Sequence, residues 1–195
     1  MSKTRTFIAV AAVDAVHAAA VGAIERLAGA TENVKWVEPE NLHWTLQFLG
    51  DLDDQEMATV CMRVRRVAAR VPAFTMQADG VGAFPSIQRP RTLWLGAGDG
   101  GEEFCRLQRE IEDALLDLGF RADNRKFVPH LTLGRASRGG NPGPLLSERL
   151  AKLANYPAGD GGPVAQAVDE VTVFASELTR EGPHYHVLAT APLGD

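Results

Sequence analysis

The chain has 195 residues, of which 45% are hydrophobic and 23% are charged, and its formal net charge is -5 at pH 7. This length and composition are typical of a protein with a real core that forms one domain, or one domain with two lobes. The negative balance argues against broad, nonspecific binding to a nucleic-acid backbone, which needs a basic face, but it leaves room for a small local basic site.

The sequence also carries information about the compartment. Cys61 and Cys105 both fall in helical patterns, so we expect them to be free thiols of the core in a reducing cytosol. No stretch reaches the roughly 18 apolar residues that a membrane-spanning helix needs. The sequence therefore predicts a cytoplasmic protein that does not enter a membrane.

The first part of the chain predicts strands and helices in alternation, from apolar runs and from apolar residues at helical spacing. Asp53 and Glu56 have the spacing of a capping box, which marks the start of a helix. The expected elements are a strand at 5–13, a helix at 15–28, strands at 34–37 and 42–50, and a helix at 53–71.

The second part continues the alternation. The expected elements are a strand with a turn at 73–84, a loop at 86–92, a strand at 92–98, a helix at 102–118, a strand region at 125–136, a short helix at 145–154, and strands at 167–178 and 184–193. The last two strands are close enough in sequence to form a hairpin.

Two motifs recur at nearly the same offset. HWTL begins at His43 and HLTL begins at His130, and 130 − 43 = 87; RTFIAV begins at Arg5 and RTLWLG at Arg91, and 91 − 5 = 86. A constant offset at separate places indicates a repeated strand–helix–strand unit, here approximately 5–50 and 91–137. We therefore expect a single bilobal domain over 1–195, with two similar lobes related by a pseudo-two-fold axis.

Each motif presents one imidazole and one hydroxyl together. Side chains alternate along a strand, so His43 shares a face with Thr45, and His130 shares one with Thr132. Imidazole titrates near neutrality, so one ring can deprotonate a water while the other protonates a leaving oxygen. The hydroxyls can donate to an anionic oxygen between the rings. This set of groups suits phosphodiester chemistry without a metal.

A structural alternative exists for each motif. A single His-x-Thr on a strand is most often a half-exposed polar face, and two copies could be an inherited scaffold without activity. A scaffold, however, has no packing reason to keep an outward histidine in both copies. We therefore favour the catalytic interpretation of His43 and His130.

Phe48 and Arg135 lie five residues after the two histidines. Strict alternation would turn both toward the apolar face, although Gly50 and Gly134 offer places where a strand can twist. In the functional interpretation, Phe48 stacks on a base and Arg135 grips a phosphate or a base. In the structural one, they are a core phenylalanine and a surface arginine. We favour function for Arg135 and the core for Phe48, and we expect a loop or structural role for Arg91.

His184 and His186 would lie on one face of a strand, as two metal ligands can. No carboxylate or cysteine motif accompanies them, so the sequence predicts no metal site.

These motifs give the chain a resemblance to a known superfamily. It resembles the two-histidine (2H) phosphoesterases, which carry two His-x-Thr/Ser motifs, and within them the branch of RNA 2′,3′-cyclic phosphodiesterases, also described as 2′-5′ RNA ligases. The matching pieces are RTFIAV, NLHWTLQFLG, RPRTLWLG, FVPHLTLGR and SELTREGPHY. The resemblance implies an α+β fold whose two pseudo-two-fold-related lobes have mainly antiparallel sheets and outer helices around a central cleft.

The resemblance also implies a reaction. RNA or nucleotide ends with a 2′,3′-cyclic phosphate would be opened to a 2′-phosphate, with no metal or other cofactor. His43 would be the acid for the 3′-oxygen, His130 the base for water, and Thr45 and Thr132 the phosphate ligands. Small cyclic nucleotides are alternative substrates, and a binding module without turnover or a 2′-5′ RNA ligase are alternative functions. We expect a monomer.

Overall fold

The structure is a computed structural model and describes residues 3–120, 126–137, 140, 142–154, 162–179 and 182–194. Its helices are α1 (Asp14–Ala28), α2 (Asp54–Ala68), α3 (Gly101–Leu115) and α4 (Pro144–Leu153), with 3₁₀ turns η1 (Pro39–Asn41) and η2 (Leu116–Leu118). Its strands are β1 (Thr4–Ala11), β2 (Val34–Trp36), β3 (His43–Leu52), β4 (Phe74–Ser86), β5 (Arg89–Ala97), β6 (His130–Ala136), β7 (Val164–Val168), β8 (Glu170–Leu178) and β9 (Pro183–Pro192). In this described part, no helix is long and apolar enough to cross a bilayer.

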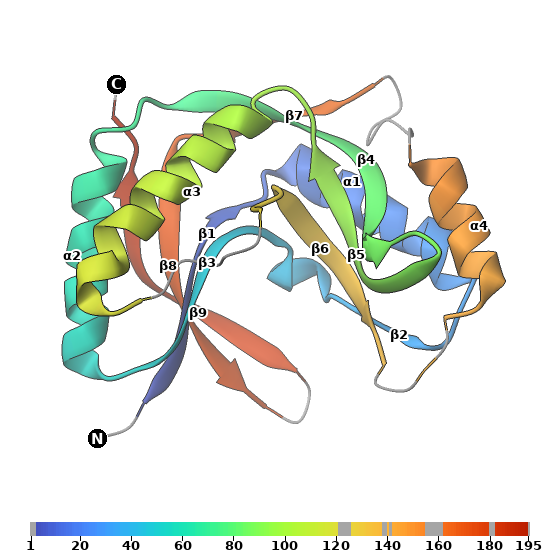
Figure 1. Cartoon of the computed structure of the whole chain (residues 1–195), viewed down its shortest axis with the longest axis horizontal. Helices are drawn as coiled ribbons and strands as arrows, with labels where there is room; N and C mark the ends of the chain where they lie inside the picture. Colours follow the sequence, from blue (N-terminus) through green and yellow to red (C-terminus); the bar gives the residue numbers. More distant parts are fainter. Residues whose placement is uncertain are drawn as a thin grey trace.

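The strands form one curled sheet (Figure 1). Its order is β7-β4-β5-β6-β3-β1-β8-β9, and β2 pairs with β6. Neighbouring strands are antiparallel throughout this order. The expected α+β fold with antiparallel pairing is confirmed, but its two halves belong to one continuous sheet, joined where β3 meets β6.

The junction between the halves is a single pair of residues, Trp44 on β3 and Leu131 on β6. These residues are 131 − 44 = 87 apart, which is the offset of the histidine motifs. Opposed residues of an antiparallel pair are related by a local two-fold axis, so this axis relates equivalent positions of the two halves. The register supports the expected internal repeat and gives the pseudo-two-fold axis a definite place.

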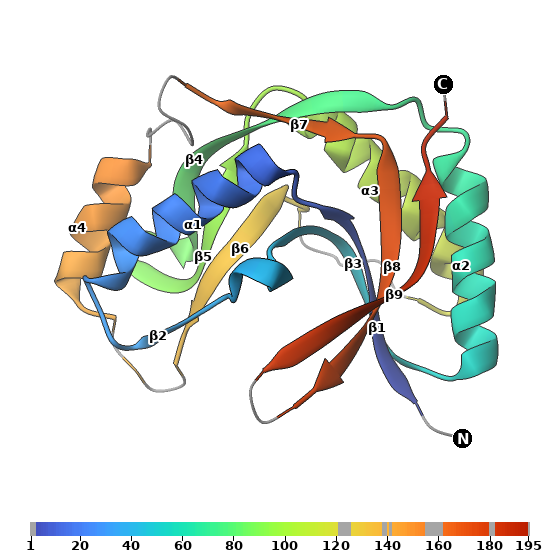
Figure 2. The ribbon, with the colours of Figure 1, turned by 180° about the vertical axis from the view of Figure 1, so that it is seen from behind.

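The helices lie over the two ends of the sheet. α1 follows β1 in sequence but packs against β6, β7 and α4, in the other half. α3 follows β5 and packs mainly against α2, the helix that covers β8 and β9. Figure 2 shows α1 and α4 at one end and α2 and α3 at the other.

The core follows the predicted apolar stripes. Phe104, Leu107, Ile111 and Leu115 of α3 are buried, and Phe104 packs against the fully buried Trp44 with ring centroids 6.2 Å apart. The predicted capping box at the start of α2 is confirmed: Asp53 accepts from the backbone N–H groups of Gln55 and Glu56, and the Glu56 carboxylate accepts from the Asp53 N–H.

Two predicted boundaries are wrong. The expected loop at 86–92 is the tip of the β4–β5 hairpin, and Arg91 lies within strand β5. Proline usually ends a strand because it has no N–H, but here Pro85 and Pro90 oppose each other beside a register shift that absorbs the break. The strand expected at 167–178 is divided at Asp169, because β7 pairs with β4 in one half and β8 pairs with β1 in the other.

A bulge interrupts both motif strands at equivalent positions. On β3, Thr45 pairs with Ala9 and Gln47 with Ile8, so Leu46 has no opposing residue on β1. On β6, Leu133 is skipped in the same way by β5, and 133 − 46 = 87. A bulge shifts the alternation of side chains by one residue. Residues after the bulge therefore point to the face opposite the one that strict alternation predicts.

Gly134 follows the second bulge, at a position where β2 packs closely against β6. A Cβ atom there would lie 2.8 Å from Val34 Cγ1 and 2.9 Å from Trp36 Cε3, whereas a Cβ at Gly22 in α1 would meet nothing within 4 Å. We expect Gly134→Ala to lower the free energy of unfolding by about 1–3 kcal/mol through overpacking. Gly22→Ala should raise it by about 0.5–1 kcal/mol, because alanine favours a helix interior. Urea denaturation of both variants checks this pair, and shifts of the same sign would contradict it.

Candidate active site

The two histidines begin their strands in the same way. His43 is the first residue of β3 and His130 the first of β6. The Nδ1 atom of His43 lies 2.7 Å from the Asn41 carbonyl oxygen, and that of His130 lies 2.7 Å from the Val128 carbonyl oxygen. A carbonyl can only accept, so Nδ1 of each ring donates. In a neutral ring, Nε2 is then left with the lone pair that can take up a proton.

The register at the centre of the sheet brings the two motifs together. Extending the Trp44–Leu131 pair by one residue on either side sets His43 opposite Thr132 and Thr45 opposite His130. The two imidazoles thus lie on a diagonal of the sheet, which in regular sheets joins Cβ atoms about 7–8 Å apart. Such a spacing suits two groups that act on opposite sides of one phosphate.

The surroundings lower the proton affinity of both rings. Burial lowers the pKa of His43 and of His130, and the hydrogen bond from each ring to a backbone carbonyl opposes this effect. The Arg135 guanidinium lowers the pKa of both rings further, and the charge of His130 lowers the pKa of His43. A proton on one ring therefore makes a proton on the other less favourable.

Aromatic side chains provide this burial. The ring of His43 lies 4.9 Å from that of Phe7 and 5.4 Å from that of Tyr185, while the ring of His130 meets that of Phe84 edge-on at 5.0 Å. Burial also raises the pKa of Tyr185, against the opposing charge of Arg135, so its hydroxyl keeps its proton at neutral pH and can donate a hydrogen bond. The sequence reasoning missed these three aromatic residues.

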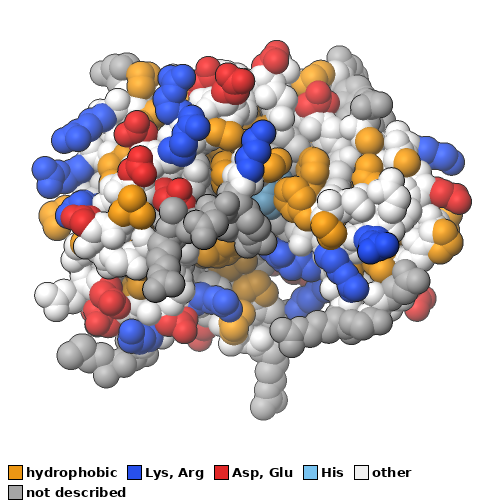
Figure 3. Space-filling view, viewed as in Figure 1, with side chains coloured by type: hydrophobic (Ala, Val, Ile, Leu, Met, Phe, Trp, Pro, Cys, Tyr) orange, Lys and Arg blue, Asp and Glu red, His pale blue; other side chains and the backbone are white. Residues whose placement is uncertain are grey.

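A pocket of about 230 Å³ gathers all the expected site residues except His43. It is lined by Thr45, Leu46, Gln47, Phe48, Gln108, Glu112, Phe127, His130, Thr132 and Arg135. His43 lies next to this pocket, because extending the Trp44–Leu131 pair sets His43 opposite Thr132, which lines it. The space-filling view shows a recessed histidine between the halves, with hydrophobic and cationic side chains around it (Figure 3).

The two bulges determine to which face of the sheet Phe48 and Arg135 point, five residues after each histidine. Phe48 is 65% exposed, so the expectation that it belongs to the core is wrong. The bulge at Leu46 turns it to the side of Thr45, and both line the pocket. The equivalent bulge at Leu133 does the same for Arg135, whose Nη1 donates to Thr92 Oγ1 over 3.2 Å.

A second pocket, of about 480 Å³, continues from the first. Both are lined by Phe127, His130 and Arg135, and the second adds Phe84, Pro85, Thr92, Lys126 and Val128. Aromatic rings beside cations can hold a planar base next to an anionic phosphate.

The His-x-His pair lies away from this arrangement of pockets. His184 and His186 are exposed on β9, and His186 Nε2 lies 3.5 Å from Glu177 Oε2. Over the ranges that the structure describes, no three His, Cys, Asp or Glu residues are grouped as ligands for a metal ion.

The chain is similar to several known proteins. A family model described as LigT like phosphoesterase matches residues 15–94 and 95–185. An RNA 2′,3′-cyclic phosphodiesterase of Methanothermobacter thermautotrophicus is 35% identical over 94% of this chain and 95% of its own length, and one of Thermotoga maritima is 34% identical over 94% and 92%. The crystal structure of TT0787 of Thermus thermophilus has a TM-score of 0.77 at 28% identity, covering 98% of this chain and 99% of the other. That of Escherichia coli LigT complexed with 3′-AMP has a TM-score of 0.73 at 26% identity, covering 99% of each chain.

Proposed function

The chain belongs to the LigT-like phosphoesterase family, and we propose that it is an RNA 2′,3′-cyclic phosphodiesterase that uses His43 and His130 for proton transfer. The observation that carries the proposal is the arrangement of two equivalent His/Thr pairs around the Trp44–Leu131 pair. A module that only binds nucleotides would need the hydroxyls and Arg135, but it would not need two imidazoles that each keep Nε2 available.

The reaction adds one water to the cyclic phosphate. Neutral His130 takes a proton from the water through Nε2 as the water oxygen bonds to phosphorus. The bond between phosphorus and the 3′-oxygen breaks, and charged His43 gives its proton to that oxygen. The products are a 2′-phosphate and a 3′-hydroxyl. The pair ends with the proton on His130, and exchange with solvent restores the starting state. Each proton transfer typically contributes about 10²–10⁴-fold to the rate.

Arg135 and the two threonines hold the phosphate between the rings. Thr45 lies opposite His130 and Thr132 opposite His43, so each hydroxyl accompanies the ring of the other strand. The hydroxyls and the Arg135 guanidinium can donate to the non-bridging oxygens, which gain charge as water attacks. The effect of the Arg135 charge on the pKa of both rings supports its place next to both.

Phe48 provides a platform for the base of the terminal nucleotide. Its exposed ring lies on the pocket side of β3 and contacts only Phe7 among the aromatic rings of the described residues, at 5.9 Å. Stacking of a base on such a ring is worth about 1–3 kcal/mol and tolerates any base. The site therefore suits RNA ends without a strong preference for one base.

The proposal includes the location and the assembly of the enzyme. Cys61 and Cys105 are free thiols, which supports a reducing cytoplasm. β3 and β6 of one chain supply both histidines and both threonines, so a monomer contains the complete catalytic pair.

Phosphorus NMR of a nucleoside 2′,3′-cyclic phosphate in the presence of EDTA tests the function. We expect conversion to the nucleoside 2′-phosphate, because the mechanism takes its acid, its base and its anion donors from side chains alone. The double variant His43→Gln/His130→Gln should bind the nucleotide without converting it. Binding without turnover by the natural sequence would show a binding module, and activity that is lost in EDTA and restored by zinc or magnesium would overturn the mechanism.

A change of leaving group separates the roles of the two rings. A 3′-deoxynucleoside 2′-(para-nitrophenyl phosphate) has no neighbouring hydroxyl that could attack the phosphorus, so water must attack it, and the product is again a 2′-phosphate. Its acidic phenol leaves with little help from an acid. We expect His43→Ala to lose about 10²–10⁴-fold in kcat/KM on the cyclic phosphate and to regain most of it on this ester. His130→Ala should lose activity on both substrates, since water must still be activated. Rescue of His130→Ala instead would show that the roles are reversed, and near-normal activity of both variants would show that neither ring is catalytic.

A further inference from the structure

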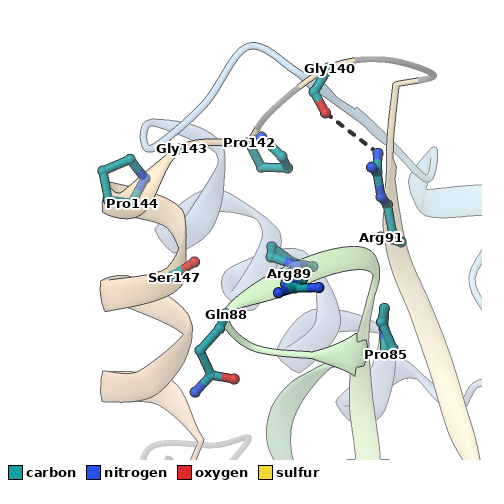
Figure 4. A pocket seen from close by; sticks show the side chains of 10 residues that line it. Pro85, Gln88, Arg89, Arg91, Gly140, Pro142, Gly143, Pro144 and Ser147 are labelled. Atoms are coloured by element: carbon teal, nitrogen blue, oxygen red, sulfur yellow. Dashed lines mark hydrogen bonds between the residues drawn. The ribbon is translucent and has the colours of Figure 1, made fainter.

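A third pocket, which the proposed mechanism does not use, lies between the β4–β5 hairpin and the start of α4. It has a volume of about 560 Å³. It is lined by Pro85, Gln88, Arg89, Pro90, Arg91, Gly140, Pro142, Gly143, Pro144 and Ser147 (Figure 4). We refer to it as the arginine groove.

The arginine groove is positively charged. None of its lining residues is acidic, and its charged members are Arg89 and Arg91, which are two positions apart on β5. Figure 4 shows Arg89 in the space between the hairpin and α4, while Arg91 Nη1 donates to the Gly140 carbonyl over 3.5 Å. A guanidinium has five N–H donors, so this one long hydrogen bond leaves most of the donors of Arg91 available to a ligand.

The arginine groove continues from the catalytic pockets. Pro85 lines both it and the pocket that contains His130 and Arg135. β5 forms the connection. Thr92 pairs with Phe84 and Arg89 with Ser86, and Phe84 and Ser86 share one face of β4, so Arg89 lies on the face of Thr92. Thr92 pairs with Arg135 in the sheet and accepts its hydrogen bond. A ligand that leaves the catalytic centre along β5 therefore passes from one cation to the next.

A strand of RNA has the chemistry that this path fits. It carries one negative charge per nucleotide, and arginine donates to phosphate oxygens through a planar fork. The prolines offer apolar walls to sugars and bases. The whole chain has a net charge of -5, so an RNA strand cannot be attracted by the surface at large and needs local cations.

We propose that the arginine groove binds the phosphodiester backbone of the nucleotides that precede the cyclic end, so that the enzyme prefers an RNA strand to a mononucleotide. The inference rests on the proposed function, since it needs the cyclic phosphate at the two histidines. A mononucleotide fills only the catalytic pockets, whereas an oligonucleotide also reaches Arg89 and Arg91.

The test compares two substrates in two variants. The variant Arg89→Gln/Arg91→Gln keeps polar side chains but removes both charges from the groove. The matched control is Arg66→Gln/Arg70→Gln, which removes two exposed charges from α2 and from the segment after it, beside the other half of the sheet. The substrates are a nucleoside 2′,3′-cyclic phosphate and a tetraribonucleotide that ends in the same group. Thermal unfolding verifies that each variant is folded.

We expect the groove variant to lose about 10–100-fold in kcat/KM on the tetraribonucleotide, since the loss of each arginine–phosphate contact should cost about tenfold when one or both contacts are removed. It should keep its activity on the mononucleotide. The slope of log(kcat/KM) against log(salt concentration) for the tetraribonucleotide should become shallower by about 0.7 for each phosphate that the variant no longer binds. The control variant should change neither value. Equal losses on both substrates, or no loss on either, would overturn the proposal.

A binding measurement keeps this test separate from the test of the reaction. If the natural sequence fails to open either cyclic phosphate, the proposed function fails. Fluorescence anisotropy then compares binding of a labelled tetraribonucleotide that ends in a 2′-phosphate. Weaker binding by Arg89→Gln/Arg91→Gln than by the control variant would support the groove, and equal binding by the two variants would contradict it.

Discussion

The pairing of Trp44 with Leu131 is the constraint on which the site depends. Both side chains are buried, and Trp44 packs against Phe104 of α3. Because neighbouring residues of a strand point to opposite faces, burial of this pair turns the residues on either side of it away from the helices. Those residues are the two histidines and the two threonines. The hydrophobic core of the sheet junction and the proposed catalytic face are therefore the two faces of the same strand pair.

The same junction explains why the two rings have similar environments. The equivalent positions of the halves meet at the pair, so each histidine begins its strand, donates Nδ1 to a carbonyl two residues earlier and lies opposite the threonine of the other strand. The two halves differ in the side chains around the histidines. Phe7 and Tyr185 pack around His43, whereas Phe84 packs against His130. At the position five residues after the histidine, one half has Phe48 and the other has Arg135. A symmetric pair of imidazoles thus lies in an asymmetric pocket, and in the proposed mechanism one side of it binds a phosphate and the other a base.

The sequence was informative where one residue type had to recur in a fixed pattern. The offset between the motifs predicted a repeat, which the Trp44–Leu131 register supports. Alternation predicted which residues share the faces of Trp44 and His43. Alternation failed at Phe48, because the bulge at Leu46 arises from the register with β1, which lies far away in the sequence. The recurrence of a Leu at the bulge in both motifs is the one local signal that could have indicated it. The aromatic side chains around the histidines could not be predicted. Phe7, Phe84 and Tyr185 lie on strands far from the two motifs in sequence, and only the folded sheet brings them to the site.

The pH dependence of kcat/KM on a 2′,3′-cyclic phosphate tests most directly whether the two rings act as one acid–base pair. The base must be neutral and the acid charged, so the rate should rise with pH as one ring loses its proton and fall again as the other does. Burial and Arg135 lower the pKa of both rings, so both limbs should lie on the acid side of the ordinary histidine value of about 6.5. We expect a bell-shaped profile with an acidic optimum, and His43→Ala and His130→Ala should each lose one limb. A rate that does not change between about pH 5 and 8 would contradict it, since a reaction that needs one charged and one neutral histidine must slow down as the pH rises past the pKa of the acid.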